Sequence, residues 1–141
     1  MSEKRRVLVL CTGNSARSQM AEGLINAELS DTWEAHSAGT KPAEQVHPLA
    51  VQAMAELGID ISHHVTKDLR PFFGEPFDMV ITVCDNARKS CPAWLGGGTV
   101  EHMGFPDPSL AEGSPEERLQ AFRDVRDALQ ERLLNRLREG A

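Results

Sequence analysis

The chain has 141 residues, of which 40% are hydrophobic and 26% charged, a composition typical of one ordinary globular domain. Its formal net charge of -6 leaves no basic excess to neutralise phosphates, which argues against general nucleic-acid binding. The longest apolar runs are too short to cross a bilayer, so we expect no membrane association. The N-terminal MSEKRR leads into a strand without the apolar core of a signal peptide, which favours a cytoplasmic location.

Strands and helices are predicted to alternate along the chain. In order, we expect a strand at 6–10, a helix at 18–29, a strand at 33–40, a helix at 48–58, strands at 77–84 and 99–105, and a final helix from 114 to 137. Met20, Leu24 and Ala27 are predicted to lie on one face of the first helix. Proline at the start of the second helix and Gly58 at its end are typical helix boundaries.

The final helix carries the clearest pattern. Ser114 and Glu117 form a capping-box sequence at its start. Apolar residues then recur at helical spacing: Leu119, Phe122, Val125, Leu129, Leu133 and Leu137.

This alternation predicts the α/β class: a single three-layer domain over residues 1–141, with a four-stranded, mostly parallel sheet and helices on both faces. The segments TKPAEQ, RPFFGEP and WLGGG are expected to be the loosest parts. Ligands of such sheets bind at the carboxyl ends of strands, where Cys11 and Cys84 are both expected.

Cys11 to Arg17 reads C-T-G-N-S-A-R and predicts a phosphate-binding loop after the first strand. Gly13 and Asn14 tolerate the left-handed backbone that such a curled loop needs. The following helix adds N-terminal amides and the positive end of its dipole, and the Arg17 guanidinium can bind two oxygens of a tetrahedral oxyanion. The predicted oxyanion site comprises Thr12, Gly13, Asn14, Ser15, Ala16, Arg17 and Ser18.

The same positive field should lower the pKa of Cys11 and hold it as a nucleophilic thiolate, to which Ser18 can donate a hydrogen bond. Two other interpretations are that Cys11 is only a small buried hydrophobe, or that the loop is a dinucleotide-binding turn. The G-x-G-x-x-G pattern is absent, so we favour the nucleophile.

Three cysteines are an odd number for a static disulfide framework and point to catalysis, redox exchange or metal binding. Cys84 and Cys91 are seven residues apart, which does not match zinc-ligand spacing, and no histidine pair has that spacing. We therefore expect no metal and treat the five histidines as structural or solvated. The interpretation that Cys84 is only a buried core residue stays open at this point.

The sequence resembles the thioredoxin-coupled arsenate reductases, which share the fold of the low-molecular-weight protein tyrosine phosphatases. The resemblance rests on CTGNSARSQMAEG, HSAGT, DISHH, VCDNARKSCP and FPDP, and it extends from the first strand to the DP segment. CTGNSARS alone does not separate reductase from phosphatase, whereas Cys84 and Cys91 favour the reductase.

The resemblance implies a three-cysteine relay. Cys11 attacks arsenic, Cys84 attacks the Cys11 sulfur and releases arsenite, and Cys91 then forms a disulfide with Cys84. Reducing arsenate takes two electrons, which a dithiol supplies by becoming a disulfide. Thioredoxin is the implied partner that regenerates the thiols, and no cofactor is implied.

The resemblance also implies that Asp107, between two prolines, is the general acid. The alternative is a plain Asp-Pro turn. Ser109 stands where the phosphatases usually have a tyrosine, and the chain has no tyrosine at all, which predicts a more open pocket mouth.

Two positions differ from the reductase pattern. Ala16 replaces a fourth cysteine that some relatives carry and the relay does not need. Some relatives also bind potassium through a glutamate, a serine and an aspartate. Glu22 and Ser37 match the glutamate and the serine. The position of the aspartate is taken by Lys67 or, with a shift of one residue, by Asp68. We favour Lys67, whose ammonium would substitute for the cation.

The resemblance therefore implies an arsenate reductase dependent on thioredoxin, with weak phosphatase activity as a side reaction. A monomer is the default expectation, since the sequence does not indicate an oligomeric state. The alternative enzyme is a low-molecular-weight tyrosine or aryl phosphatase acting through Cys11, Arg17 and Asp107. A non-catalytic oxyanion binder would have no use for three thiols. A thiol redox sensor would need neither Arg17 nor the loop.

Overall fold

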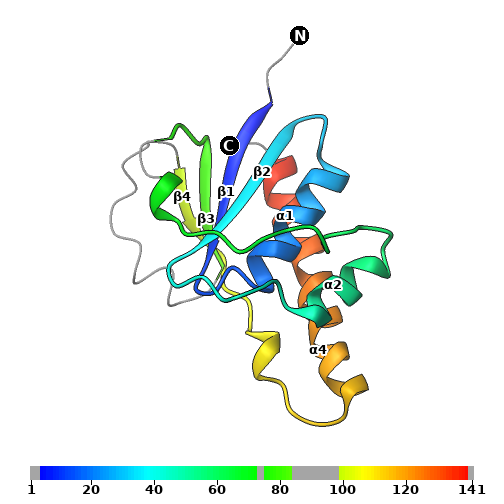
Figure 1. Cartoon of the computed structure of the whole chain (residues 1–141). Coiled ribbons are helices and arrows are strands. Elements are labelled where there is room, and N and C mark those ends of the chain that lie inside the picture. Colours follow the sequence, from blue (N-terminus) through cyan, green and yellow to red (C-terminus); the bar gives the residue numbers. More distant parts are fainter. Residues whose placement is uncertain (1–3, 73–74, 84–98, 140–141) are drawn as a thin grey trace.

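The computed structural model of the chain describes residues 4–72, 75–83 and 99–139. Its centre is a four-stranded sheet in the order β2-β1-β3-β4, with all three strand pairs parallel (Figure 1). The strands are β1 (Arg5–Cys11), β2 (Trp33–Gly39), β3 (Met79–Thr82) and β4 (Thr99–His102). This confirms the predicted four-stranded parallel sheet.

Strand β1 occupies the middle of the sheet because it is apolar on both faces. Val7 to Leu10 are fully buried, as a parallel strand covered on both sides requires. Its register with β2 brings Cys11 opposite Gly39. The buried strand β3 pairs along the other edge of β1, Val9 opposite Ile81.

The described helices pack together beside the sheet (Figure 1). They are α1 (Arg17–Glu28), α2 (Pro48–Ala55), α4 (Pro115–Ala128) and α5 (Leu134–Arg138), with 3-10 turns η1 (Arg70–Phe72) and η2 (Pro108–Leu110) and a π turn η3 (Leu129–Leu133) joining α4 to α5. No helix within 4–72, 75–83 and 99–139 is long and apolar enough to cross a membrane.

Different parts of the chain pack against the two faces of the sheet. Helix α1 covers the face to which Ser37 of β2 points, since Ser37 bonds to Glu22 of α1. Alternation along a strand directs His36 to the opposite face. There its ring centroid lies 6.2 Å from that of Phe72 and 6.0 Å from that of Phe77.

The face predicted for α1 is buried only in part. Met20 and Leu24 are fully buried, but Ala27 is exposed. Ile25 is the last buried residue within α1, and Leu29 at its C-cap is buried again, so Ala27 lies on the exposed side of the last turn. There the Asn26 amide side chain accepts from the backbone N–H of Ala35 at 2.8 Å and donates to its carbonyl oxygen at 3.1 Å.

The later helices follow the sequence signals. Pro48 is the first residue of α2, and Gly58, three residues after its end, has a φ of 76°. Ser114 and Glu117 form the reciprocal capping box of α4. All six apolar residues predicted for the final helix are buried. The π turn η3 within that helix was not predicted.

Candidate active site

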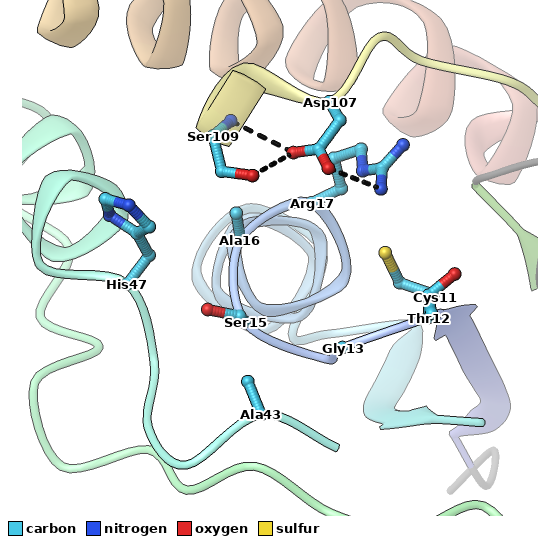
Figure 2. Close-up of a pocket in the computed structure, with 10 residues that line it drawn as sticks. All are labelled: Cys11, Thr12, Gly13, Ser15, Ala16, Arg17, Ala43, His47, Asp107 and Ser109. Atoms are coloured by element: carbon cyan, nitrogen blue, oxygen red, sulfur yellow. Dashed lines mark hydrogen bonds and ion pairs between the residues drawn. The ribbon is translucent and has the colours of Figure 1, made fainter. Parts of the chain in front are cut away.

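A pocket of about 280 Å³ lies at the carboxyl end of β1, where the chain curls from Cys11 to the start of α1 (Figure 2). Its lining includes Cys11 and five of the seven residues predicted to bind an oxyanion, all except Asn14 and Ser18. Asp107 and Ser109 contribute from the loop and turn that follow β4. The remaining lining residues are Ala43 and His47.

The segment 40–47, which we call the strap, determines how the loop's peptide groups point. Four strap amides donate to loop carbonyls: Thr40 to Cys11 at 3.2 Å, Lys41 to Thr12 at 2.9 Å, Ala43 to Gly13 at 2.9 Å and His47 to Ser15 at 2.9 Å. A trans peptide directs its C=O and N–H to opposite sides, so the amide groups of 12, 13, 14 and 16 point away from the strap. Converging amides are what a tetrahedral anion needs. TKPAEQ, predicted to be loose, is therefore part of the site's framework.

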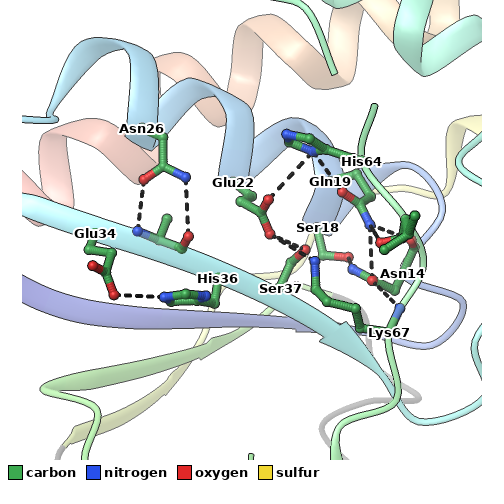
Figure 3. Close-up of polar contacts among 12 residues, drawn as sticks. Asn14, Ser18, Gln19, Glu22, Asn26, Glu34, His36, Ser37, His64 and Lys67 are labelled. Carbon is green, nitrogen blue, oxygen red and sulfur yellow. Dashed lines mark hydrogen bonds and ion pairs between the residues drawn. The ribbon is translucent and has the colours of Figure 1, made fainter. Parts of the chain in front are cut away.

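Asn14 supports the loop from behind (Figure 3). It has a φ of 51° and is fully buried, which confirms the predicted left-handed residue, whereas Gly13 has no positive φ. The Asn14 amide donates to Ser18 Oγ at 2.8 Å, and its Oδ1 accepts from the backbone N–H of Lys67 at 2.9 Å. Gln19 Nε2 also donates to Oδ1, at 3.0 Å.

Gly39, the last residue of β2, was not predicted as a site residue. A Cβ atom there would lie 2.5 Å from the Thr12 carbonyl oxygen and 3.0 Å from the Asn14 nitrogen. Only glycine lets the strand end approach the loop this closely. The signal in the sequence was the HSAGT segment, in which the glycine ends a predicted strand.

Arg17 begins α1 and is only 9% exposed. Its Nη1 donates to the Phe105 carbonyl oxygen at 3.0 Å, and its Nη2 lies 3.6 Å from Asp107 Oδ2. In the part of the chain that the structure describes, Arg17 Nε is the buried side-chain polar atom with no hydrogen-bond partner. A buried guanidinium N–H of this kind requires an acceptor, and an anion is one group that can supply it.

Asp107 lies across the pocket mouth from the loop (Figure 2). It caps η2: its Oδ1 accepts from the Ser109 backbone N–H at 3.0 Å and from Ser109 Oγ at 2.7 Å. These two bonds fix the carboxylate's orientation and leave Oδ2 facing Arg17. Ser109, predicted only as a replacement for tyrosine, thus has an orienting contact of its own.

His47, predicted to be structural or solvated, lines the pocket. Its Nδ1 accepts from the Leu49 N–H at 3.1 Å and caps α2, and its ring centroid lies 4.6 Å from that of Phe122. Burial lowers the pKa of His47, and the field of Arg118 lowers it further, against an opposing contribution from Asp107. The sequence signal was a histidine directly before a helix-starting proline.

A polar cluster lies behind the loop around Glu22 (Figure 3). Ser37 Oγ donates to Glu22 Oε1 at 2.7 Å, and Lys67 Nζ reaches the same oxygen at 3.3 Å. Asp68 instead pairs with Arg70 at 2.7 Å. These contacts support the interpretation in which the Lys67 ammonium, rather than an aspartate, faces Glu22.

His64 completes this cluster. Its Nδ1 lies 3.4 Å from Glu22 Oε2 and 3.0 Å from Gln19 Oε1. Burial lowers the pKa of His64, although Glu22 opposes that shift.

Cys84 and Cys91 lie outside the described residues. The structure describes the chain as far as Val83, whose amide donates to the Leu10 carbonyl at 2.9 Å. Leu10 directly precedes Cys11, so Val83 lies beside the end of β1.

Comparison with known proteins agrees with this geometry. The family described as low molecular weight phosphotyrosine protein phosphatase matches residues 6–139. An arsenate reductase of Bacillus licheniformis is 45% identical over 92% of this chain and 93% of its own length.

Two solved structures are similar along nearly the whole chain. One is described as an arsenate reductase in the phosphate binding state, with a TM-score of 0.81 and 30% identity over 97% of this chain and 99% of its own. The other is a low molecular weight protein tyrosine phosphatase from T. tengcongensis, with a TM-score of 0.80 and 30% identity over 98% and 100%.

Proposed function

The chain belongs to the low molecular weight phosphotyrosine protein phosphatase family, and from that premise we propose that it reduces arsenate to arsenite in the cytoplasm, with Cys11 as the nucleophile. The observation that carries the proposal is the pocket itself. Cys11 lies at the end of β1, inside a loop whose amides point away from the strap, beside an Arg17 guanidinium with an unpartnered buried N–H. Arsenate and phosphate are both tetrahedral oxyanions that fit such a site.

In the first step, loop amides and Arg17 bind the anion and the Cys11 thiolate attacks arsenic. An arsenic–oxygen bond breaks, and Asp107 protonates the departing oxygen, which leaves as water. Asp107 suits this role because it lines the pocket and Ser109 orients its carboxylate through Oδ1. The product is a covalent adduct in which the Cys11 sulfur is bound to arsenic.

The electrons come from thiols. The Cys84 thiolate attacks the Cys11 sulfur, the sulfur–arsenic electron pair passes to arsenic, and arsenite leaves a Cys11–Cys84 disulfide. Cys91 then attacks Cys84 and frees the Cys11 thiolate. Thioredoxin reduces the resulting Cys84–Cys91 disulfide, so two electrons enter for each arsenate reduced.

The second candidate is an aryl or tyrosyl phosphatase acting through Cys11, Arg17 and Asp107. Its specific support is the similarity to the T. tengcongensis phosphatase. Here water, rather than a second thiol, would hydrolyse the adduct on Cys11. The two candidates therefore share every residue of the pocket and differ in their need for Cys84 and Cys91.

The deciding experiment compares two assays on the same variants. Arsenate-dependent NADPH oxidation with thioredoxin and its reductase measures reduction, and p-nitrophenyl phosphate hydrolysis measures phosphatase activity. Cys11→Ser should abolish both activities. Cys84→Ser should abolish arsenite release, and Cys91→Ser should allow a single turnover, while both keep phosphatase activity.

Mass spectrometry after one equivalent of arsenate identifies the disulfide left in each variant. We expect Cys11–Cys84 in Cys91→Ser and Cys84–Cys91 in the wild type. Wild-type rates of arsenate turnover in both Cys84→Ser and Cys91→Ser would exclude the relay and leave the phosphatase as the better assignment.

A further inference from the structure

Phe105 connects the sheet to the pocket, although it does not line the pocket. Its backbone N–H donates to the Val83 carbonyl at 3.1 Å, and its carbonyl oxygen accepts from Arg17 Nη1 at 3.0 Å. Its side chain is only 5% exposed. Pro106 and Asp107 follow directly, so any shift of Phe105 moves both the acceptor for Arg17 and the start of the loop that carries Asp107.

The ring of Phe105 is covered by an arginine from the C-terminal helical segment. The Arg132 guanidinium carbon lies 4.5 Å from the ring centroid, within the range of a cation–π contact. Arg132 Nη1 also donates to the Gly104 carbonyl at 3.4 Å. Arg132 therefore contacts two consecutive residues of the chain leading to Asp107.

The local structure around Arg132 is unusual. It lies in the π turn η3, between the buried residues Leu129 and Leu133. A π turn changes the direction of side chains relative to a regular α-helix and often occurs at functional sites.

Arg132 also differs from neighbouring arginines in its partner. Arg123 and Arg126 pair with Glu56, and Arg136 pairs with Glu101. Among the described residues, Arg132 has no carboxylate partner and contacts Phe105 and Gly104 instead.

We propose that Arg132 is a positioning residue that acts through Phe105. It holds the Phe105 ring and the Gly104 carbonyl, and so fixes the acceptor of Arg17 and the start of the Asp107 loop. The effect on anion binding follows from the geometry alone. The effect on proton donation rests on the proposed function of Asp107.

The test uses three single variants of the full chain. Arg132→Met keeps an unbranched apolar stem and removes the cation, and Arg132→Lys restores a cation. Arg136→Met is the matched control, because it breaks the ion pair with Glu101 in the same helical segment without touching Phe105.

The first measurement is independent of any enzyme activity. Inorganic phosphate should protect Cys11 from alkylation by iodoacetate, read by mass spectrometry on the Cys11 peptide. Arg132→Met should raise the half-protecting phosphate concentration by about two- to fivefold, the size expected for one exposed cation–π contact. Arg132→Lys should recover most of that loss, and Arg136→Met should match the wild type.

The second measurement reads proton donation. When a general acid is misaligned, hydrolysis slows most for esters with a poor leaving group, because their leaving oxygen depends most on protonation. Arg132→Met should therefore lower kcat/KM for phenyl phosphate more than for 2,4-dinitrophenyl phosphate. A merely structural role would lower both by the same factor.

A double variant tests the route through Phe105. Phe105→Leu keeps an apolar side chain but removes the ring face, so adding Arg132→Met should change phosphate protection much less than it does in the wild type. The proposal is overturned if Arg132→Met and Arg136→Met give the same protection curve. It is also overturned if the effects of Phe105→Leu and Arg132→Met on phosphate protection are fully additive in the double variant. If the wild type turns over neither arsenate nor aryl phosphate, the proposed function fails, and the protection data still decide the role of Arg132.

Discussion

The side chain of Asn14 is fully buried behind the pocket loop, where it donates to Ser18 and accepts from Gln19 and Lys67. These bonds satisfy both the oxygen and the nitrogen of its amide, which a buried amide requires. They also hold the residue at the φ of 51° that turns the loop. Asn14 therefore contributes the shape of the loop, whereas Cys11 and Arg17 carry the chemistry that we propose.

Asp107 gives the first prediction. Asp107→Asn keeps an oxygen that can accept hydrogen bonds from Ser109, but the amide cannot protonate the leaving group. The value of kcat/KM for p-nitrophenyl phosphate should therefore fall by about 10²- to 10⁴-fold. Ser109→Ala removes only the 2.7 Å hydroxyl bond to Oδ1 and should cost much less. Steady-state kinetics of the two variants check this. An unchanged rate for Asp107→Asn would make the residue a plain turn residue.

His47 gives a prediction for stability against pH. Its pKa is lowered in the folded protein, mainly by burial, so the unfolded chain binds the proton more tightly. The His47 contribution to the free energy of unfolding is therefore complete above about pH 6.5 and is lost as the pH falls below it. Protonation of Nδ1 would also remove the acceptor that caps α2.

His47→Asn is the informative variant, because asparagine is a good helix cap and does not titrate. Urea unfolding at pH 7.5 and pH 5.5 should show a smaller loss of stability on acidification than in the wild type. Some loss should remain, since burial also lowers the pKa of His64. The same loss in both proteins would contradict the assignment.

At the scale of elements, the pocket depends on how closely β2 and the strap approach the loop. A Cβ on Gly39 would lie 2.5 Å from the Thr12 carbonyl oxygen, and this backbone atom cannot move aside without shifting the loop. Gly39→Ala should therefore lower the free energy of unfolding by about 1–3 kcal/mol and weaken phosphate binding.

Gly13→Ala is the matched control for stability. The nearest atom to a Cβ there is Ala43 Cβ at 3.7 Å, an ordinary contact, and Gly13 has no positive φ. Urea unfolding should show a much smaller loss for Gly13→Ala than for Gly39→Ala. Equal losses would mean that the close approach of β2 does not constrain the loop.

Much of this arrangement followed from sequence patterns because those patterns record burial. The apolar run Val7–Leu10 predicted a strand covered on both faces, and C-x5-R between a strand and a helix predicted the pocket. The role of the strap was not predicted, because its contacts are backbone bonds to a distant loop, which side-chain patterns do not record. The exposure of Ala27 was not predicted, because a small apolar residue fits the exposed side of a helix as well as the buried side, and the chain is buried again at Leu29.

At the scale of the whole molecule, β1 has neighbours from distant parts of the chain. It pairs with β2, which begins at Trp33, and with β3, whose Met79 lies opposite Val7. Long-range parallel strand pairs form slowly, because the entropy cost of closing a large loop comes before any stabilising contact is made. The fully buried residues of β1 and β3 are in the two inner strands of the sheet, so their amides should exchange only by global unfolding, and native-state hydrogen exchange should find them among the slowest.

The central position of β1 has a consequence for synthesis on the ribosome. The strand is made first, yet its second neighbour is made about 70 residues later, or about 4–14 s at ~5–20 residues/s. During that interval the nascent chain carries its most apolar run with one side unpaired, next to the Cys11 thiol. A chaperone that shields the first forty residues would cover this apolar run, and Cys11 with it, until β3 is available to pair with β1.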